Sequence, residues 1–180
     1  MTSLNPPSER IWWKQPLDRL EGTWIAIALV WSLIMFFMMP MWHIYGKQNL
    51  SNEAYKTTPE AFMAKTTAMV EQYTVRTETE QQLPVVRPPP GSDVYLLGRL
   101  WQWWPLLELE KGKTYRFHLS SMDWQHGFSL QPLNINLQIV PGYEMVVTFT
   151  PDTSGEFTVI CNEFCGIGHH TMVGKIYVTE

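Results

Sequence analysis

The sequence is poor in charged residues and in cysteine, and this shortage narrows what the protein can do. Only 17% of its 180 residues are Asp, Glu, Lys or Arg, and the formal net charge is −4. Binding to nucleic acid requires clustered Lys and Arg, so we expect no nucleic-acid partner. The sequence also lacks a phosphate-binding loop, a carboxylate dyad and a nucleophile–base pair. We therefore expect no catalytic residue in this chain.

Charged residues are absent altogether from Gly22 to Gly46. A helix rises about 1.5 Å per residue, so about 20 residues cross the hydrocarbon core of a bilayer. Trp24 at one end, and Trp42 and Tyr45 at the other, suit the two membrane interfaces. A cleaved signal peptide would need a small-residue cleavage site, which "FFMMPMWHIYG" does not offer. We predict one transmembrane helix over 22–46, with Pro40 kinking or ending its last turn.

The basic residues around this span predict its orientation. Three precede it closely and two follow it at a comparable distance: Arg10, Lys14 and Arg19 before it, and Lys47 and Lys56 after it. Loops on the cytoplasmic side carry the excess of Lys and Arg. We expect residues 1–21 in the cytoplasm and everything after the span outside it.

Residues 47–90 are predicted to form a helical segment followed by a proline-rich spacer. Thr58 can cap a helix that starts at Pro59, and three apolar side chains can share one of its faces: Phe62, Met69 and Tyr73. The run "RPPPG" then stiffens the chain into an extended form. We place the start of the folded domain near Gly91.

Residues 91–180 have the pattern of a mainly β domain. Short runs such as "TYRFHLSS", "YEMVVTFT" and "EFTVIC" are separated by turn signals such as "EKGK", "VPGY" and "PDTSG". Seven or more short strands in one small domain predict a Greek-key sandwich or barrel.

Soft metal ligands are concentrated near the C-terminus. "CNEFCGIGHHTM" holds Cys161, Cys165, His169 and Met172, and "SSMDWQHGF" adds His126 upstream. A disulfide between the cysteines is one interpretation, but it leaves the His and Met residues unexplained. A structural zinc site of two Cys and two His is a second interpretation. The thioether of Met172 favours copper over zinc.

Copper allows two arrangements of these ligands. A mononuclear blue-copper site uses one Cys, two His and a weak axial Met, and this sequence has one additional Cys. Two thiolates can instead bridge two copper ions, with one His and one weak ligand for each ion. Met172 would be one weak ligand, and the backbone carbonyl of Glu163 the other. Sharing one electron over two ions leaves little to rearrange on reduction.

Together these two stretches resemble the dinuclear copper (CuA) motif of cytochrome c oxidase subunit II. The resemblance implies a cupredoxin fold and a role for each ligand residue. Cys161 and Cys165 would bridge both copper ions, and His126 and His169 would each bind one. The Cys-to-His spacing of the family selects His169 rather than His170.

The resemblance also implies an electron-transfer subunit of a membrane heme-copper oxidase, which is an oxidoreductase. Electrons would come from a c-type cytochrome or a small copper protein and would pass to heme in a large catalytic membrane subunit, where oxygen is reduced. With its one span, the chain resembles the single-anchor branch of B-type oxidases, in which a small extra helical subunit can replace the missing span. Its location would be a bacterial or archaeal cell membrane, with the copper domain outside the cytoplasm.

Two rival functions remain open at this point. A heme-copper nitric oxide reductase can use a CuA subunit of the same shape, and the difference lies in its catalytic subunit. A copper-delivery protein would need an exposed, exchangeable site, whereas this sequence is expected to place bridging thiolates between strands; a mononuclear copper spectrum would support delivery.

Five residues near the expected ligands have tentative roles. Trp101, Trp103 and Trp104 lie in "GRLWQWWP", and on a strand Trp101 and Trp103 would point the same way. In the family an aromatic cluster in this region serves electron uptake and docking of the donor, and core packing is the alternative. We expect Asp123 to orient the loop that carries His126, or to cap a turn, and Trp124 to pack beside His126.

Overall fold

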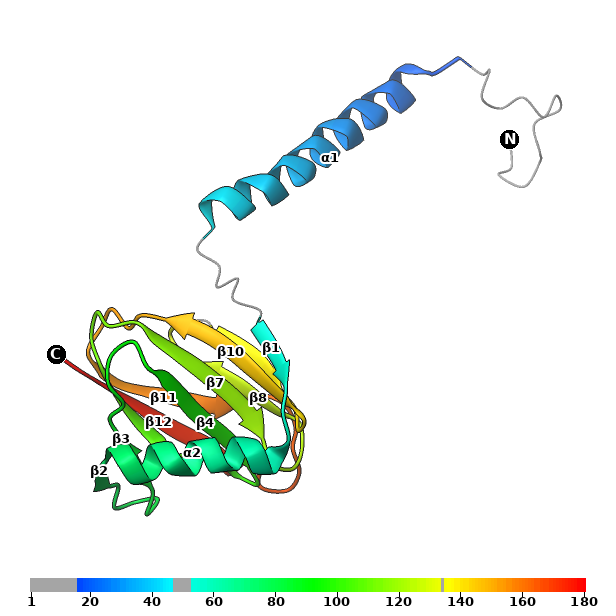
Figure 1. Ribbon diagram of the computed structural model, residues 1–180. Helices are drawn as coiled ribbons and strands as arrows, with labels where there is room; N and C mark the ends of the chain where they lie inside the picture. Colours follow the sequence, from blue (N-terminus) through cyan, green and yellow to red (C-terminus); the bar gives the residue numbers. More distant parts are fainter. Residues whose placement is uncertain (1–15, 47–52, 134) are drawn as a thin grey trace. The chain divides into compact units, whose positions relative to one another are not determined.

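The computed structural model describes residues 16–46, 53–133 and 135–180, which form one long helix and, separately, a β-sandwich with a second helix (Figure 1). The chain divides into two compact units, residues 1–48 and 49–180. Arg10, Lys14 and Lys47, which contribute to the predicted orientation, lie outside the described residues.

Helix α1 (Arg19–Tyr45) contains the charge-free run except its last residue, Gly46, which caps the C-terminus of the helix. Asp18 caps its N-terminus: the Asp18 carboxylate accepts from the Glu21 amide at 2.7 Å, and the Glu21 side chain accepts from the Asp18 amide. Pro40 lies inside the helix and does not end it. With 27 residues and no buried side chain, α1 is long and apolar enough to cross a membrane.

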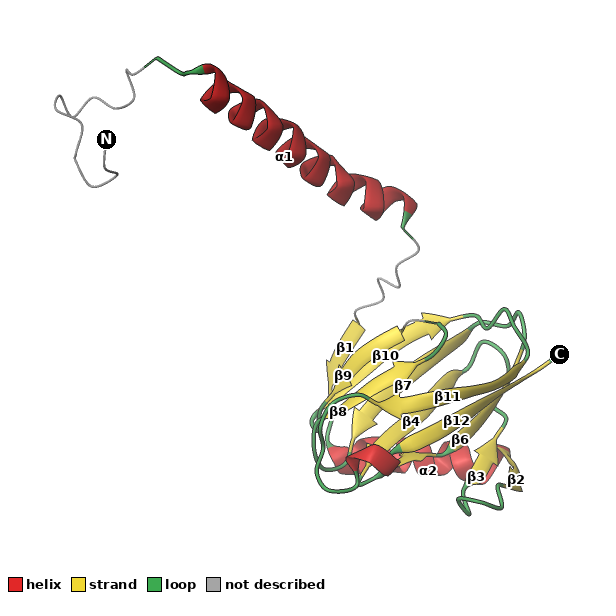
Figure 2. Ribbon diagram, turned by 180° about the vertical axis from the view of Figure 1, so that it is seen from behind, coloured by secondary structure: helices red, strands yellow, loops and turns green. Residues whose placement is uncertain are grey.

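The second unit is a sandwich of two sheets (Figure 1; Figure 2). The five-stranded sheet has the order β1 (Glu53–Lys56), β10 (Tyr143–Phe149), β7 (Tyr115–Ser121), β4 (Asp93–Arg99) and β5 (Gln102–Trp104). The seven-stranded sheet has the order β2 (Thr74–Thr77), β3 (Pro84–Val86), β6 (Leu106–Glu110), β12 (Val173–Thr179), β11 (Gly155–Cys161), β8 (His126–Leu130) and β9 (Ile135–Ile139). The predicted mainly β fold behind one N-terminal helix is confirmed.

The sheets enclose a core of alternate side chains from facing strands. In β12 the residues Gly174, Ile176 and Val178 are buried, and the residues between them are less so, which is the period of two expected for a strand with one face in the core. Phe117 and Phe128 contribute large, fully buried rings from the two sheets. Burial of this apolar surface is the main force that holds the sheets together.

The segment before Gly91 belongs to the sandwich and is not a spacer. Helix α2 (Pro59–Tyr73) is capped by Thr58, as predicted, and buries Phe62 and Met69 against the sheets. Both views show α2 lying along the sandwich (Figure 1; Figure 2). Strand β1 pairs with β10, and β3 runs parallel to β6. The compact unit therefore begins well before the position that the sequence suggested.

An ion cluster fixes this segment to the sandwich. Glu108 of β6 is 2% exposed, and its carboxylate accepts hydrogen bonds from Arg76 of β2 and from Arg87, which follows β3. Burial acts to raise the pKa of Glu108, but the two guanidinium groups outweigh it and hold this pKa below its usual 4.5. The carboxylate is therefore charged at neutral pH.

Candidate metal centre

The predicted ligands come from two strands and the connection between β11 and β12. His126 is the first residue of β8, and Cys161 is the last residue of the neighbouring strand β11. The ligand loop, residues 161–172, carries the other candidates, including the short helix η2 (His169–Thr171). The amide of Cys161 donates to the carbonyl of Met172 at 3.1 Å, so the two ends of the ligand loop are hydrogen-bonded to each other.

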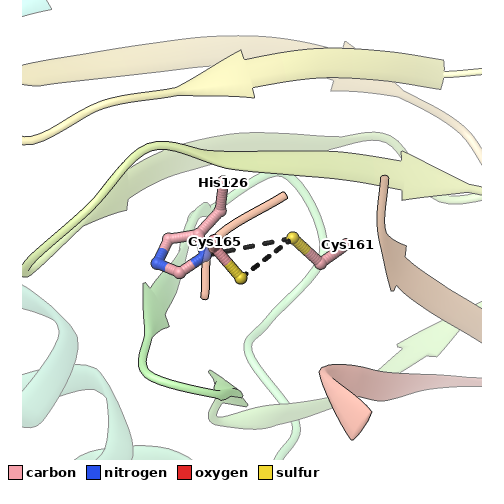
Figure 3. Close-up of side chains that lie close together, drawn as sticks. All are labelled: His126, Cys161 and Cys165. Carbon is pink, nitrogen blue, oxygen red and sulfur yellow. Dashed lines mark hydrogen bonds between the residues drawn. The ribbon is translucent and has the colours of Figure 1, made fainter. Parts of the chain in front are cut away.

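The two thiols and the two imidazoles lie next to one another. The sulfurs of Cys161 and Cys165 are 3.7 Å apart, and both thiols are free. Nδ1 of His126 lies 3.9 Å from the Cys161 sulfur, and Nδ1 of His169 lies 3.7 Å from the Cys165 sulfur. Figure 3 shows the first imidazole directed at the pair of thiols. Each imidazole therefore faces a different sulfur.

The two expected weak ligands complete the same cluster. The thioether sulfur of Met172 lies 3.8 Å from the Cys165 sulfur, and the carbonyl oxygen of Glu163 lies 3.2 Å from the Cys161 sulfur. Met172 is fully buried. All six predicted ligand groups are thus brought together, whereas the neighbouring His170 is exposed.

These distances and this donor set suit metal ions bound between the side chains. Metal–sulfur bonds of about 2.3 Å and metal–nitrogen bonds of about 2.1 Å allow shared ligands to lie up to about 4.6 Å (two sulfurs) or 4.4 Å (sulfur and nitrogen) apart. The 3.7 Å between the sulfurs, and the 3.7 and 3.9 Å between sulfur and nitrogen, fall within these limits. A fully buried thioether beside thiolates is a soft donor set, which selects copper.

Burial makes the Cys165 thiol a poor acid in the absence of a cation. Burial, together with the hydrogen bond to Cys161 and the charge of that residue, raises the pKa of the Cys165 thiol to about 11. A thiolate must replace the thiol before sulfur can bind a metal. The positive charge of a metal ion compensates the buried thiolates, so metal binding and deprotonation occur together.

Asp123 fixes the orientation of the His126 ring. Its carboxylate accepts from Nε2 of His126 at 2.8 Å, and from the backbone amides of Leu100 at 2.8 Å and Trp124 at 2.6 Å. Burial acts to raise the pKa of Asp123, but these hydrogen bonds outweigh it and lower the pKa. The ionised carboxylate accepts a hydrogen bond from the Nε2–H, which keeps the proton on Nε2 and leaves the lone pair of Nδ1 directed toward Cys161.

The three tryptophans of "GRLWQWWP" have three different environments. Trp101 lies in the turn before β5, so strand alternation does not apply to it; it is 38% exposed, and its indole N–H donates to the Cys165 carbonyl at 3.1 Å. Trp103 is buried, and its ring centroid lies 6.4 Å from that of His126. Trp104 packs on the cluster of Leu83, Val85 and Leu106. Only Trp101 of these three both touches the ligand loop and is substantially exposed.

The expectation that Trp124 packs beside His126 is wrong. Its side chain is 63% exposed. The backbone explains this, because the Trp124 amide donates to Asp123 and its carbonyl accepts from the Ser121 hydroxyl at 2.5 Å. These bonds close a tight turn that leaves the indole outside.

Gly127 is a residue that the sequence analysis did not single out. A Cβ atom at Gly127 would lie 2.0 Å from Oδ1 of Asn162 and 2.8 Å from the amide nitrogen of Glu163. Only glycine lets the ligand loop approach β8 this closely, with the Asn162 amide donating to the Gly127 carbonyl at 3.2 Å. A glycine inside a strand is a known signal of close backbone approach.

Comparison with known proteins identifies the family. A family profile described as "Cytochrome C oxidase subunit II, periplasmic domain" matches residues 106–178. Cytochrome c oxidase subunit 2 of Thermus thermophilus is 37% identical over 93 residues, which cover 51% of this chain and 69% of that protein. A second sequence of that name, from the same species, is also 37% identical over 93 residues, but the match spans only 55% of its length.

A solved structure extends the likeness to most of the chain. A chain from a heme-copper terminal oxidase dimer, determined by cryo-EM, superimposes with a TM-score of 0.57 at 24% identity, covering 89% of this chain and 100% of that one. This likeness shows a shared fold. The matched profile and relatives show that the chain belongs to the cytochrome c oxidase subunit II family, the CuA-binding subunits of heme-copper oxidases.

Proposed function

We propose that the cluster around Cys161 and Cys165 holds two copper ions. The two thiolates bridge both ions, His126 and His169 each bind one ion, and Met172 and the carbonyl of Glu163 are the weak ligands. One observation carries this assignment: the sulfurs lie 3.7 Å apart, and each imidazole faces a different one of them. A mononuclear site would leave one Cys–His pair without a metal.

The chain would serve as the electron-accepting subunit of its oxidase. When bound, the copper pair supplies a one-electron carrier that rearranges little on reduction. The protein buries four of the six ligand residues, holds His126 through Asp123, and excludes water from the sulfurs; the four are His126, Cys161, Cys165 and Met172. The electron comes from a c-type cytochrome or a small copper protein and leaves to heme in the large catalytic membrane subunit, which reduces oxygen.

Trp101 is the proposed point of electron uptake. It is partly exposed, and its indole N–H is bonded to the carbonyl of a bridging cysteine. A docked donor can therefore contact a side chain that itself contacts the site. Trp103 is buried and Trp104 packs away from the ligands, so neither offers the same route.

The proposed location follows from α1 and from the excess of basic residues on its N-terminal side. The helix anchors the chain in a bacterial or archaeal cell membrane with its N-terminus in the cytoplasm and the copper domain outside. A small extra helical subunit would supply the second span. Protease treatment of intact spheroplasts tests this orientation, because only an outward-facing sandwich is cleaved.

Electron paramagnetic resonance of the copper-loaded full-length chain tests the site. Hyperfine structure from one electron shared by two equivalent coppers, with two copper ions per chain, is the expected result. A one-copper spectrum, or a silent zinc-loaded protein, would contradict the assignment. The catalytic subunit that co-purifies decides the terminal acceptor: oxygen consumption supports the oxidase, and reduction of nitric oxide without oxygen consumption supports the reductase.

A further inference from the structure

The ring of Trp101 occupies the space where a side chain of Gly168 would stand. A Cβ atom built on Gly168 lies 2.2 Å from Cδ2 and 2.4 Å from Cε3 of Trp101. Non-bonded carbons prefer a separation of about 3.5–4.0 Å, so no side chain fits while the ring is in place. The indole therefore lies directly on the backbone of the ligand loop.

The backbone conformation of Gly168 does not itself require glycine. Its φ is −87° and its ψ is 9°, values that other residues also adopt. Gly166 differs, because its φ is +113°, which L-residues rarely adopt. Gly166 is thus a conformational requirement of the loop, whereas Gly168 is required only for the space that Trp101 fills.

Two contacts hold Trp101 in this position. Its indole N–H donates to the Cys165 carbonyl at 3.1 Å, and its ring lies over Gly168. A methyl group at Gly168 would lift the ring and break or lengthen that hydrogen bond. The loop itself could keep its conformation, so the change would act on Trp101 and not on the ligands.

We propose that Gly168 is a positioning residue for electron uptake. Because Gly168 has no side chain, the Trp101 ring can lie directly against the loop between Cys165 and His169. This inference rests on the proposed role of Trp101, and it adds a residue that is neither a ligand nor the electron-accepting side chain.

The test uses full-length chains in the assembled oxidase. The variants are Gly168→Ala, Trp101→Ala and the double variant, and Gly22→Ala is the matched control, because a Cβ atom at Gly22 meets nothing within 4 Å. Three measurements are made on each: copper per chain, the rate of electron transfer from a reduced c-type cytochrome, and hydroxyl-radical oxidation of Trp101 followed by mass spectrometry.

Gly168→Ala should increase oxidation of Trp101 and slow electron uptake several-fold, because the displaced indole loses its hydrogen bond to the Cys165 carbonyl and its contact with the ligand loop. Trp101→Ala should slow it at least as much. The double variant should be no slower than Trp101→Ala, since the added methyl group then meets no ring. Gly22→Ala should match the parent in all three measurements.

If oxidation of Trp101 is unchanged in Gly168→Ala, the proposal that Gly168 positions the Trp101 ring is wrong. Electron uptake that is clearly slower in the double variant than in Trp101→Ala would also contradict the proposal. A loss of copper in both Gly168→Ala and the double variant would do the same. In either case Gly168 would be needed for the conformation of the ligand loop itself. Loss of copper in Gly168→Ala alone would also contradict the proposal, because the added methyl group would then disturb the ligands and not only Trp101. A normal rate in Trp101→Ala would instead refute the proposed role of Trp101, separately from the oxidation result.

Discussion

Replacing Phe62 by alanine tests whether α2 is part of the domain core. The Phe62 side chain is 0% exposed, and its ring meets that of Tyr95 edge-on, with centroids 5.7 Å apart. Removing a buried Phe side chain costs about 3–5 kcal/mol of unfolding free energy. A typical domain has about 5–15 kcal/mol in total, so this one substitution should remove a large part of the stability.

The measurement is urea unfolding of the full-length chain in detergent, followed by tryptophan fluorescence. Phe164→Ala is the matched control: that ring is 82% exposed, so its loss should change the free energy by no more than about 0.5 kcal/mol. A loss below about 1 kcal/mol for Phe62→Ala would refute the reasoning. It would mean that α2 only covers a domain whose core begins near Gly91.

Three further predictions concern truncation, copper binding and pH. A fragment of residues 91–180 lacks α2, β1, β2 and β3, and we expect its circular dichroism to show no cooperative unfolding, whereas a fragment of the whole compact unit should unfold cooperatively. Asp123→Ala should weaken copper binding by about 10–100-fold in a competition titration, because such partners of metal-binding histidines contribute that much; binding equal to that of the parent would contradict the role of Asp123. Because Arg76 and Arg87 lower the pKa of Glu108 below 4.5, the stability that this carboxylate contributes is present above that pH and is lost as the pH falls through the lowered pKa. Glu108→Gln should therefore flatten the acid limb of the curve of unfolding free energy against pH, and an unchanged limb would contradict it.

The parts of the structure that could be predicted are those whose residue pattern lies within one short stretch of the sequence. The charge-free run predicted α1 because its apolar side chains need no distant partner to indicate a membrane helix. The ligand cluster was predictable because Cys161, Cys165, His169 and Met172 share one short loop. His126 could be added only because its surroundings resembled a known motif.

The N-terminal segment was harder to place because its signals are weak. Strand β1 is short and all four of its residues are exposed, so no buried face left an alternation of apolar and polar side chains in the sequence. Strand β3 begins at Pro84, and a proline argues against a central strand unless it occupies the first position. Its partner β6 follows after the proline-rich run, so a parallel pairing with it leaves no pattern in the local sequence.

Contacts between distant residues account for the remaining errors and omissions. Trp101 and Gly168 are far apart in the sequence, and nothing beside either residue indicates that one excludes a side chain from the other. The outward position of Trp124 depends on hydrogen bonds of its backbone to Ser121 and Asp123. Residue type alone would place a tryptophan beside a buried histidine in the core.

The hydrogen bond that closes the ligand loop also bears on how such sites change in evolution. The amide of Cys161 is bonded to the carbonyl of Met172, and the strands on either side are paired, with Ile160 opposite Val173. Because both ends are held by the frame, residues inside the loop can be replaced or inserted without moving either strand. The pairing of β11 with β12 therefore does not depend on the length of the ligand loop, so an insertion between Cys161 and Met172 need not change the register of the two strands.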